Sequence, residues 1–505
     1  MKINRIAPLT RTESSIISAS IAEEHRSSFI GGKISTGPPD SRFNIIDQEE
    51  FGFETRSEQL RTAAPAHETT IVPRRGNGWR PLLYWLAAFA AIAAPVPAVG
   101  QSDAQPGSRL VGTGAVGPSE QGWSVALSAD GNTAIVGGSV DNKLTGAAWV
   151  FTRSDDVWTQ QGSKLVGTSV VGQAGQGVSV ALSADGDTAL VGGPYDNSRT
   201  GAAWVFTRSG GAWTQQGSKL IGAGAVGNAA QGAAIALSAD GNTAIVGGSQ
   251  DSLRAGAAWV FTRSGGIWTQ QGSKLVGTGA VGNAAQGAAV ALSADGNTAI
   301  VGGPLDDSYA GAAWVFARSD GVWKQLGSKL IGTGAVGKAG QGFSVALSAD
   351  GNTAIVGGLG DNKYTGAAWV YSRSGATWVY SRSGATWSQQ GSKLVGSRAV
   401  GEARQGHSVA MSADGNTAIV GGLGDNSYSG AAWIYSRSGA TWSQQGDKLV
   451  GVGAMGHAEQ GFSAALSADG NTAVVGGIAD NRVTGAAWIH NRRKGTWTQG
   501  PFLGY

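Results

Sequence analysis

The sequence contains no cysteine. Disulfide bonds, thiol catalysis and cysteine-ligated metals are therefore excluded, although the cellular compartment stays open. Histidine is also scarce, and only three of the five histidines lie in the repetitive C-terminal part. These three, His407, His457 and His490, occupy different places in their repeats, so no shared metal shell is expected.

Net charge and helical patterning are low as well. The net charge is +3 over 505 residues, which gives no reason to expect a nucleic-acid partner. No segment of the repeats has the periodicity of a helix. Glycine is abundant instead, with 83 residues spread through the repeats, and the 41% of hydrophobic residues is enough for a packed core.

The first hundred residues differ from the rest. Residues 1–71 are polar, mixed in charge and aperiodic, and we expect a disordered or untranslated leader. Residues 72–100 run from basic residues through an apolar stretch, 81–99, to small residues, which is the order of a secretory signal peptide. Translation from Val72 would make this an ordinary signal of 29 residues. An uncleaved membrane anchor through 81–99 and a buried core helix are the alternatives.

Seven copies of one unit fill residues 101–505, which we treat as one domain. The aspartate of a recurring Ser-Ala-Asp-Gly stretch marks the period. Its copies are Asp130, Asp185, Asp240, Asp295, Asp350, Asp414 and Asp469. The spacings are 55, 55, 55, 55, 64 and 55 residues, and a fixed period near this length is typical of a propeller, a solenoid or an array.

The one long spacing has a visible cause. Residues 369–377 and 378–386 both read WVYSRSGAT, and 64 minus 9 returns the period of 55. One extra strand would reverse the direction of every later strand, yet the period resumes at once. We therefore predict a longer hairpin or a surface loop on the fifth unit, in an otherwise regular ring.

Each unit reads as four strands. In the first unit, residues 124–128 alternate in polarity, Asp130-Gly131 suits a tight turn, and 133–138 is almost continuously apolar. Residues 146–154 are β-branched and aromatic, and 157–167 is the most polar segment. We predict an all-β fold, a seven-bladed β-propeller of four-stranded antiparallel blades, preceded by the disordered segment and the signal or anchor helix. Strand 124–128 should line the hub, and 157–167 should face water.

The two ends of the repeats bear on ring closure. Residues 107–117, before the first unit, repeat the amino-acid sequence of the outer strand. The last unit ends in a shortened version of the same sequence. We expect Arg109–Val111 beside the final blade, in competition with that blade's own strand. The outer strands also carry matching lysines, which we expect at an exposed edge, where charge discourages aggregation. They are Lys164, Lys219, Lys274, Lys329, Lys393 and Lys448.

The repeating pattern Gly-x-Ser-Val-Ala, Asp-Gly, Val-Gly-Gly, Gly-Ala-x-x-Val-Phe resembles the FG-GAP repeat of integrin α-subunit propellers, and more closely its bacterial extracellular form. The resemblance covers roughly residues 107–505, and seven copies match the seven blades of that family. Gln-Gly stands at the FG position and Gly-Gly at the GAP position, so the match is not complete. The resemblance implies a propeller used for adhesion or ligand binding.

Two motifs that look chemical have structural explanations. Integrin blades often bind calcium in an Asp-rich loop, but this loop offers one or two carboxylates, too few for the roughly 6–8 oxygens of calcium. Gly-x-Gly-x-x-Gly occurs five times, first at 112–117, but a strand follows instead of the helix that a dinucleotide site needs. We expect no cofactor and no metal site.

Variation between the units is the best guide to a binding site, although drift in exposed loops would also produce it. The two tryptophans of each unit are expected to pack between blades. In the loop after the second strand, the candidate ligand-binding residues are Arg199, Arg254, Tyr309, Tyr364 and Tyr428. The position before the first strand also varies, holding Trp123, Val178, Ala233, Ala288, Phe343, His407 and Phe462.

We expect an exported, monomeric binding or adhesion module whose protein or glycan ligand contacts loops on one face. It would be extracellular, periplasmic or associated with the cell envelope, and it would touch a membrane only through residues 81–99 if these are not cleaved. A structural array without a dedicated ligand and a propeller-scaffold enzyme acting on glycans are the alternatives. Neither a Ser-His-Asp ordering nor a separate carboxylate pair is evident, so no catalytic residues are expected.

Overall fold

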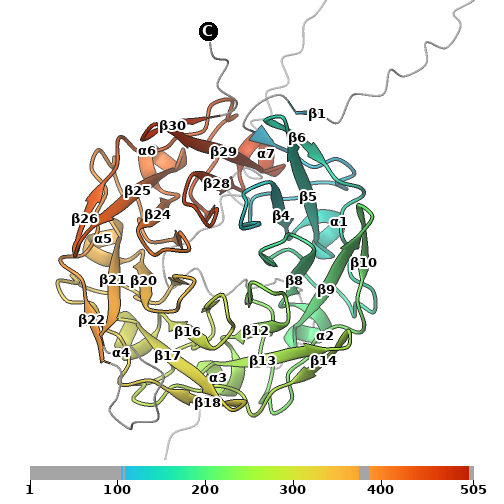
Figure 1. The fold of residues 1–505 in the computed structure, drawn as a ribbon, viewed down its shortest axis with the longest axis horizontal. Helices are drawn as coiled ribbons and strands as arrows, with labels where there is room; N and C mark the ends of the chain where they lie inside the picture. The colour runs from blue at the N-terminus through green and yellow to red at the C-terminus, as the bar shows by residue number, and fades with distance from the viewer. Residues whose placement is uncertain (1–103, 106–108, 375–385, 500–505) are drawn as a thin grey trace, which may run out of the picture. The chain divides into compact units, whose positions relative to one another are not determined.

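The computed structural model describes residues 104–105, 109–374 and 386–499. Within these ranges the chain forms seven antiparallel sheets arranged as blades around one axis (Figure 1), so the predicted seven-bladed β-propeller is confirmed. The expected leader 1–71 and the signal or anchor 72–100 lie outside the described residues. In the part of the chain that is described, no helix has the length and apolar character needed to cross a membrane.

The first two strands of each blade surround the axis, as predicted. The first strands are β3 (Ser124–Leu127), β7 (Ser179–Leu182), β11 (Ala234–Leu237), β15 (Ala289–Leu292), β19 (Ser344–Leu347), β23 (Ser408–Met411) and β27 (Ser463–Leu466). The second strands are β4 (Thr133–Gly138), β8 (Thr188–Gly193), β12 (Thr243–Gly248), β16 (Thr298–Gly303), β20 (Thr353–Gly358), β24 (Thr417–Gly422) and β28 (Thr472–Gly477). Each second strand is buried from end to end, because the neighbouring blades cover both of its faces.

The outer half of each blade has a long third strand and a short fourth strand. The third strands are β5 (Ala147–Ser154), β9 (Ala202–Ser209), β13 (Ala257–Ser264), β17 (Ala312–Ser319), β21 (Ala367–Ser374), β25 (Ala431–Ser438) and β29 (Ala486–Arg493). The fourth strands are β6 (Val157–Gln160), β10 (Ala212–Gln215), β14 (Ile267–Gln270), β18 (Val322–Gln325), β22 (Thr386–Gln389), β26 (Thr441–Gln444) and β30 (Thr496–Gln499). They are shorter than predicted: β6 ends at Gln160, and Leu165 then returns to pair with Ala148 of β5. The short strand β1 (Ala104–Gln105) adds to the free side of β6.

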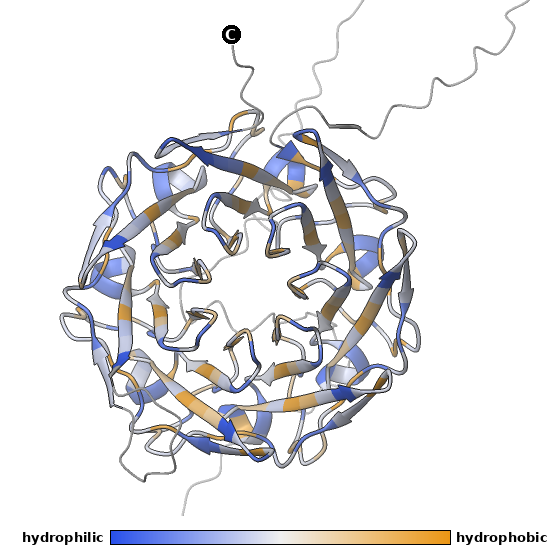
Figure 2. Ribbon diagram, in the orientation of Figure 1, coloured by the Kyte–Doolittle hydropathy of each residue, from blue (hydrophilic) through white to orange (hydrophobic). Residues whose placement is uncertain are grey.

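The hydrophobic core lies between the blades. One cluster joins Ile135 of the first blade to Val191 and Trp204 of the second. The last and first blades meet in the same way, with Val474 packed in one cluster with Val136. Figure 2 shows the apolar residues along the strands and the hydrophilic ones mainly at the turns and the outer edge. Since each blade buries its faces only against its neighbours, the blades are expected to fold as one unit.

The first tryptophan of each unit fills the space between its blade and the chain that leads into it. Trp149 is fully buried, and its Nε1–H donates to the carbonyl of Thr113 at 2.8 Å. A Cβ added to Gly112 would lie 2.1 Å from Cδ1 of Trp149, so only glycine fits there. The equivalent indoles, also fully buried, are Trp204, Trp259, Trp314, Trp369, Trp433 and Trp488. Packing therefore explains the first glycine of the Gly-x-Gly-x-x-Gly stretch, and the chain after it continues to strand β3, as expected.

Seven backbone hydrogen bonds form a closed circle around the axis. In each Ser-Ala-Asp-Gly turn, the alanine N–H donates to the alanine carbonyl of the next blade at 2.9–3.0 Å. The circle runs through Ala129, Ala184, Ala239, Ala294, Ala349, Ala413 and Ala468, and returns to Ala129. The aspartate has the predicted turn role, because Oδ1 of Asp130 accepts from Ser128 Oγ at 2.5 Å and from the N–H of Asn132 at 2.9 Å.

The N-terminal end of the propeller completes its last blade. Strand β2 (Arg109–Leu110) pairs with Trp488 and Ala487 of β29, in the place that the returning segment takes in the other blades. The prediction that Arg109–Val111 lies beside the final blade is thus confirmed. Strand β30 pairs with another part of β29, His490–Arg493, and the remainder of the last unit, which would compete with β2, lies outside the described residues.

The matching lysines are not exposed edge charges, so that prediction is wrong. Nζ of Lys164 lies 2.5 Å from Oδ2 of Asp141, a fully buried residue just after the second strand. Five more blades repeat the pair, as Lys219–Asp196, Lys274–Asp251, Lys329–Asp306, Lys393–Asp361 and Lys448–Asp425. In the last blade, Arg109 of β2 pairs with Asp480 instead. The lysine reaches a buried carboxylate because its segment folds back over the blade.

The fifth blade keeps the register of the others despite the duplication. Strands β21 and β22 pair through Ser374 and Thr386, as β5 and β6 pair through Ser154 and Val157. The extra residues therefore fall within 375–385, between the third and fourth strands, and the expected regular ring is confirmed. The predicted hairpin or loop itself lies outside the described residues.

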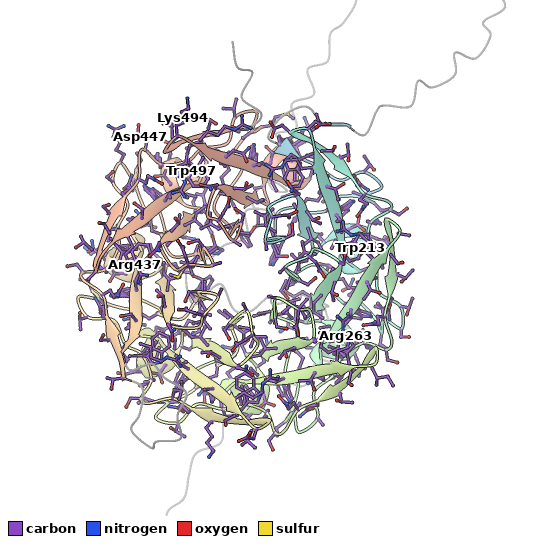
Figure 3. The ribbon with its side chains drawn as sticks, viewed as in Figure 1. Trp213, Arg263, Arg437, Asp447, Lys494 and Trp497 are labelled. Atoms are coloured by element: carbon purple, nitrogen blue, oxygen red, sulfur yellow. The ribbon has the colours of Figure 1, made fainter. Side chains whose placement is uncertain are left out.

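A glutamine on the rim links a blade to the next at five of the seven junctions. Oε1 of Gln161 accepts from Nη1 of Arg208 at 3.1 Å and from Nε1 of Trp213 at 3.0 Å. Figure 3 labels Trp213 and the next such arginine, Arg263, near the outer edge of the ring. Leu326 replaces this glutamine in the fourth blade, and the facing Nε1 of Trp387 has no hydrogen-bond partner among the described residues.

Candidate ligand-binding face

Seven short turns follow the second strands. They are α1 (Asp141–Leu144), α2 (Asp196–Arg199), α3 (Asp251–Arg254), α4 (Asp306–Tyr309), α5 (Asp361–Tyr364), α6 (Asp425–Tyr428) and α7 (Asp480–Val483). After the first residue the backbone is left-handed: in α2, φ is 49° at Asn197, 53° at Ser198 and 69° at Arg199. Such a conformation costs roughly 1–2 kcal/mol per non-glycine residue. The buried Asp196 holds the turn, since its Oδ1 accepts from the N–H of Val171 at 2.8 Å.

The five predicted binding residues end turns α2 to α6. They are Arg199, Arg254, Tyr309, Tyr364 and Tyr428, and all are half-buried. The carbonyl of each accepts a hydrogen bond from the chain that leads into the next blade, at 2.7–2.9 Å. In an antiparallel blade these turns and the lead-in chains share one face. The candidates therefore occupy one face, one per blade, and their role in binding stays a prediction.

Two of the candidates are brought together by a shared cation. The guanidinium carbon of Arg404 lies 5.3 Å from the ring centroid of Tyr364 and 5.2 Å from that of Tyr428. Nζ of Lys338 lies 4.9 Å from the ring of Tyr309. Arg199, in contrast, stacks over Tyr195 of its own blade, at 5.8 Å. The tyrosines and their cations thus follow one another across blades four to six.

Closer to the axis, four of the variable positions before the first strands form a chain of rings. Phe343, His407, Phe462 and Trp123 come from blades five, six, seven and one, and we call them the aromatic arc. Neighbouring ring centroids are 5.0 Å, 4.7 Å and 5.1 Å apart, with planes tilted by 46–56°. The same position in blades two to four holds Val178, Ala233 and Ala288. Ring closure alone brings Trp123 beside Phe462.

His407 is an uncharged member of the aromatic arc. It is buried, and its Nδ1 lies 2.8 Å from the carbonyl oxygen of Phe462. A carbonyl only accepts, so Nδ1 carries the ring proton. The pKa of His407 is lowered to about 4, mainly by burial. The hydrogen bond to the backbone of Phe462 acts to raise the pKa, and the positive charge of Arg404 lowers it further. At neutral pH this side chain therefore contributes an aromatic ring and no charge.

Three residues before each arc position lies another left-handed residue, which we call the lead-in position. Its N–H makes the hydrogen bond to the preceding turn. The lead-in positions are Glu120, Gly175, Ala230, Ala285, Gly340, Arg404 and Glu459. Charged side chains occur there only in blades six, seven and one, beside the aromatic arc. The other four blades have glycine or alanine.

Glu120 and Glu459 are on adjacent blades, although 459 minus 120 places them 339 residues apart in the sequence. Burial, and next the negative charge of Glu459, raise the pKa of Glu120 to about 7. The sequence did not reveal that these two carboxylates are neighbours, because they adjoin only when the last blade meets the first. Aligning the units on their 55-residue period and joining the two ends would have revealed the pair.

The face therefore has two unlike halves. Blades five, six, seven and one carry the aromatic arc, and the last three of these also carry the charged lead-in residues, while blades two to four carry small side chains at both positions. Rings of this kind pack against apolar surfaces, and carboxylates accept hydrogen bonds. Among the described residues, no group of three or more histidine, aspartate or glutamate side chains is placed to hold a metal ion.

Comparison with known proteins adds no family name. No family model matches the chain, and no curated protein matches it. The fold alone shows a seven-bladed propeller, and this architecture is consistent with a propeller repeat family.

Proposed function

We propose that the protein is an exported binding or adhesion module of the FG-GAP kind, which presents the face bearing turns α1–α7 to a protein or glycan ligand. One observation carries this proposal: the aromatic and charged side chains at the arc and lead-in positions collect on one half of that face. The packing residues, such as the buried tryptophans, are the same in every blade. A purely structural array would have no need of this asymmetry.

The scaffold suits such a role. Adjacent blades share hydrophobic clusters, and the hub carries a closed circle of hydrogen bonds, so the face loops stand on a rigid support. Loops held in this way are common sites of ligand recognition. The buried aspartates also hold the turns in place, because each accepts a hydrogen bond from the chain that leads into its own blade.

A binding screen with face-specific variants tests this function. The full-length protein is applied to a glycan array and to cell-surface protein extracts, beside a Tyr364→Ala/Tyr428→Ala variant. Ile267→Ala is the matched control, since this exposed residue lies at a hairpin on the opposite face. We expect the double variant to lose capture at least tenfold and the control to keep it. Absence of any captured ligand, or equal capture by all three proteins, contradicts the proposal.

Export is tested separately by N-terminal sequencing of the protein isolated from cells. A mature chain that begins near Gln101 supports export through the 72–100 signal. A chain that retains Met1 in the cytosolic fraction contradicts it.

An enzyme acting on glycans is the second candidate, and the carboxylate pair Glu120–Glu459 favours it. Glycoside hydrolases use two carboxyl groups, one of them protonated near neutral pH by its environment. Release of reducing ends from glycans captured in the screen, lost in Glu120→Gln, would distinguish this activity from binding alone.

A further inference from the structure

We propose that the junction of blades seven and one is a saccharide-binding site, in which Trp123 and Phe462 stack on a neutral sugar and Glu120 and Glu459 accept its hydroxyl groups. The proposal rests on the proposed function and names the class of ligand. It concerns four side chains that the sequence separates and the closed ring brings together.

The two rings supply the apolar part of the site. The centroids of Trp123 and Phe462 are 5.1 Å apart, with planes tilted by 56°, and both side chains keep part of their surface exposed. The C–H faces of a pyranose ring are apolar and pack on aromatic rings of this size. Two tilted rings side by side offer such a ligand more contact than one isolated ring.

The carboxylates supply the polar part. The N–H of Trp123 donates to the carbonyl of Glu120 at 3.2 Å, and Phe462 and Glu459 make the same contact, so each ring shares a tight turn with one carboxylate. Sugar hydroxyls donate to carboxylates in short, strong hydrogen bonds. An apolar ligand would cover these groups without offering a donor, whereas each hydroxyl group of a sugar offers one. A ligand rich in hydroxyl groups is therefore favoured over an apolar peptide side chain.

The surrounding charges favour a neutral sugar. Glu120 and Glu459 each stand three residues before one of the rings, and Arg404 occupies the lead-in position one blade before Glu459. An anionic glycan would meet the two carboxylates, and a cationic one would meet the guanidinium group. A neutral saccharide meets neither penalty and has both donors and acceptors to offer.

The propeller contains its own control for this site. Blade three has Ala233 at the arc position and Ala230 at the lead-in position, with the same backbone hydrogen bond between them at 3.2 Å. Trp123→Ala and Phe462→Ala therefore introduce a residue that the fold already accepts at the equivalent place. Val178→Ala is the control, because it makes a smaller truncation to the same residue at the arc position of blade two, away from the proposed site.

The experiment measures binding of neutral oligosaccharides to the full-length protein and its variants. The probes are cellotetraose, maltotetraose and N-acetylchitotetraose. Their binding is measured by calorimetry and by the change in tryptophan fluorescence. We expect at least one probe to bind and Trp123→Ala or Phe462→Ala to weaken it tenfold or more. Glu120→Gln should weaken it about fivefold, because an amide accepts hydroxyl hydrogen bonds less strongly, and Val178→Ala should leave binding unchanged.

The outcomes separate this inference from the proposed function. If none of the probes binds, or if binding survives in both ring variants, the saccharide site is refuted. Capture of a protein ligand that depends on Tyr364 and Tyr428, without saccharide binding, refutes the inference and leaves the proposed function standing. Absence of every ligand refutes both.

Discussion

At the scale of single residues, the lysine that follows the fourth strand in six blades shows that the surroundings of a side chain depend on segments distant in the sequence. The polar text around Lys329 predicts a solvated edge, yet the side chain is only 14% exposed and pairs with an aspartate that is 1% exposed. Sequence alone could not show this, because the contact depends on the segment folding back across the blade. Breaking a buried pair by removing one partner leaves an uncompensated charge.

Lys329→Met should therefore destabilise the protein strongly. We expect the free energy of unfolding to fall by about 3 kcal/mol, because Asp306 would stay buried without its cation. Lys324→Met is the matched control, since Lys324 is exposed in the same blade and should change stability by less than about 0.5 kcal/mol. Chemical denaturation of the three proteins checks this, and equal stabilities would show that the pair contributes nothing.

The buried His407 gives a second residue-scale prediction, which concerns pH. Its pKa is about 4 in the folded protein and near 6.5 when unfolded, so the unfolded state takes up the proton first as the pH falls below 6.5. The wild type should thus lose about 2 kcal/mol relative to His407→Phe between pH 7.5 and pH 5. Phenylalanine fits this position, because Phe343 and Phe462 occupy it in the adjacent blades.

Glu120 acts in the opposite direction. Its pKa is raised to about 7, so the folded state takes up that proton first and gains stability as the pH falls towards 4.5. Comparing the wild type with His407→Phe cancels this contribution, since both proteins contain Glu120. Denaturation profiles that run parallel from pH 7.5 to pH 5 would show that His407 is not held neutral in the folded state.

At the scale of strands, the sequence predicts what has a local signal. The alternation of 124–128, the Asp-Gly turn and the apolar run of 133–138 correctly place the first two strands. The fourth strand was predicted too long. The strand breaks at Gly162, and the chain returns to the blade through the single pair that Leu165 makes, which leaves no periodic pattern in the sequence. A residue that differs from its equivalents in the other blades also carries information about local contacts, as Leu326 does at the position of the rim glutamine.

Leu326→Gln should stabilise the link between blades four and five. The backbone of Leu326 lies as in the other blades, with its N–H donating to Val315 at 2.7 Å, so glutamine should reach Nε1 of Trp387 and the guanidinium group of Arg373. We expect a gain of about 1 kcal/mol, from two new hydrogen bonds offset by lost apolar burial. The reverse change in the preceding blade, Gln271→Leu, should destabilise by a similar amount. Thermal denaturation measures both, and a loss of stability in Leu326→Gln would contradict the role of the rim glutamine.

Deleting residues 378–386 should leave the fifth blade intact. The deletion restores the Ser-Gly-Ala-Thr-Trp text of the sixth blade, where Ser438 pairs with Thr441 across a two-residue turn. A shorter connection costs less entropy to close, so the melting temperature should stay the same or rise. A drop of many degrees would mean that the duplicated residues are needed by the blade.

At the scale of the whole molecule, the number of blades follows from the repeat, but the contacts across the closing junction do not. Period and strand pattern predict seven blades and even the place of Arg109–Val111. They do not show that Glu120 and Trp123 adjoin Glu459 and Phe462, because these contacts exist only when the first and last blades meet. The five candidates from the turns were found because they vary in the sequence, and the lead-in carboxylates were missed because no two of them are near in the chain.

The most direct test of this account is a cross-link between the first and last blades. Arg493 and Asp156 form an ion pair of 2.9 Å across the junction and are 53% and 42% exposed, so both accept cysteine at the surface. Since the chain has no cysteine, Asp156→Cys/Arg493→Cys provides the only two thiols. A short bismaleimide should link them within one molecule in high yield, and Asp156→Cys/Asp320→Cys, with thiols on blades one and four, should give no internal link. Failure of the first pair to link within a monomer, at a protein concentration where dimers do not form, would contradict the closed ring.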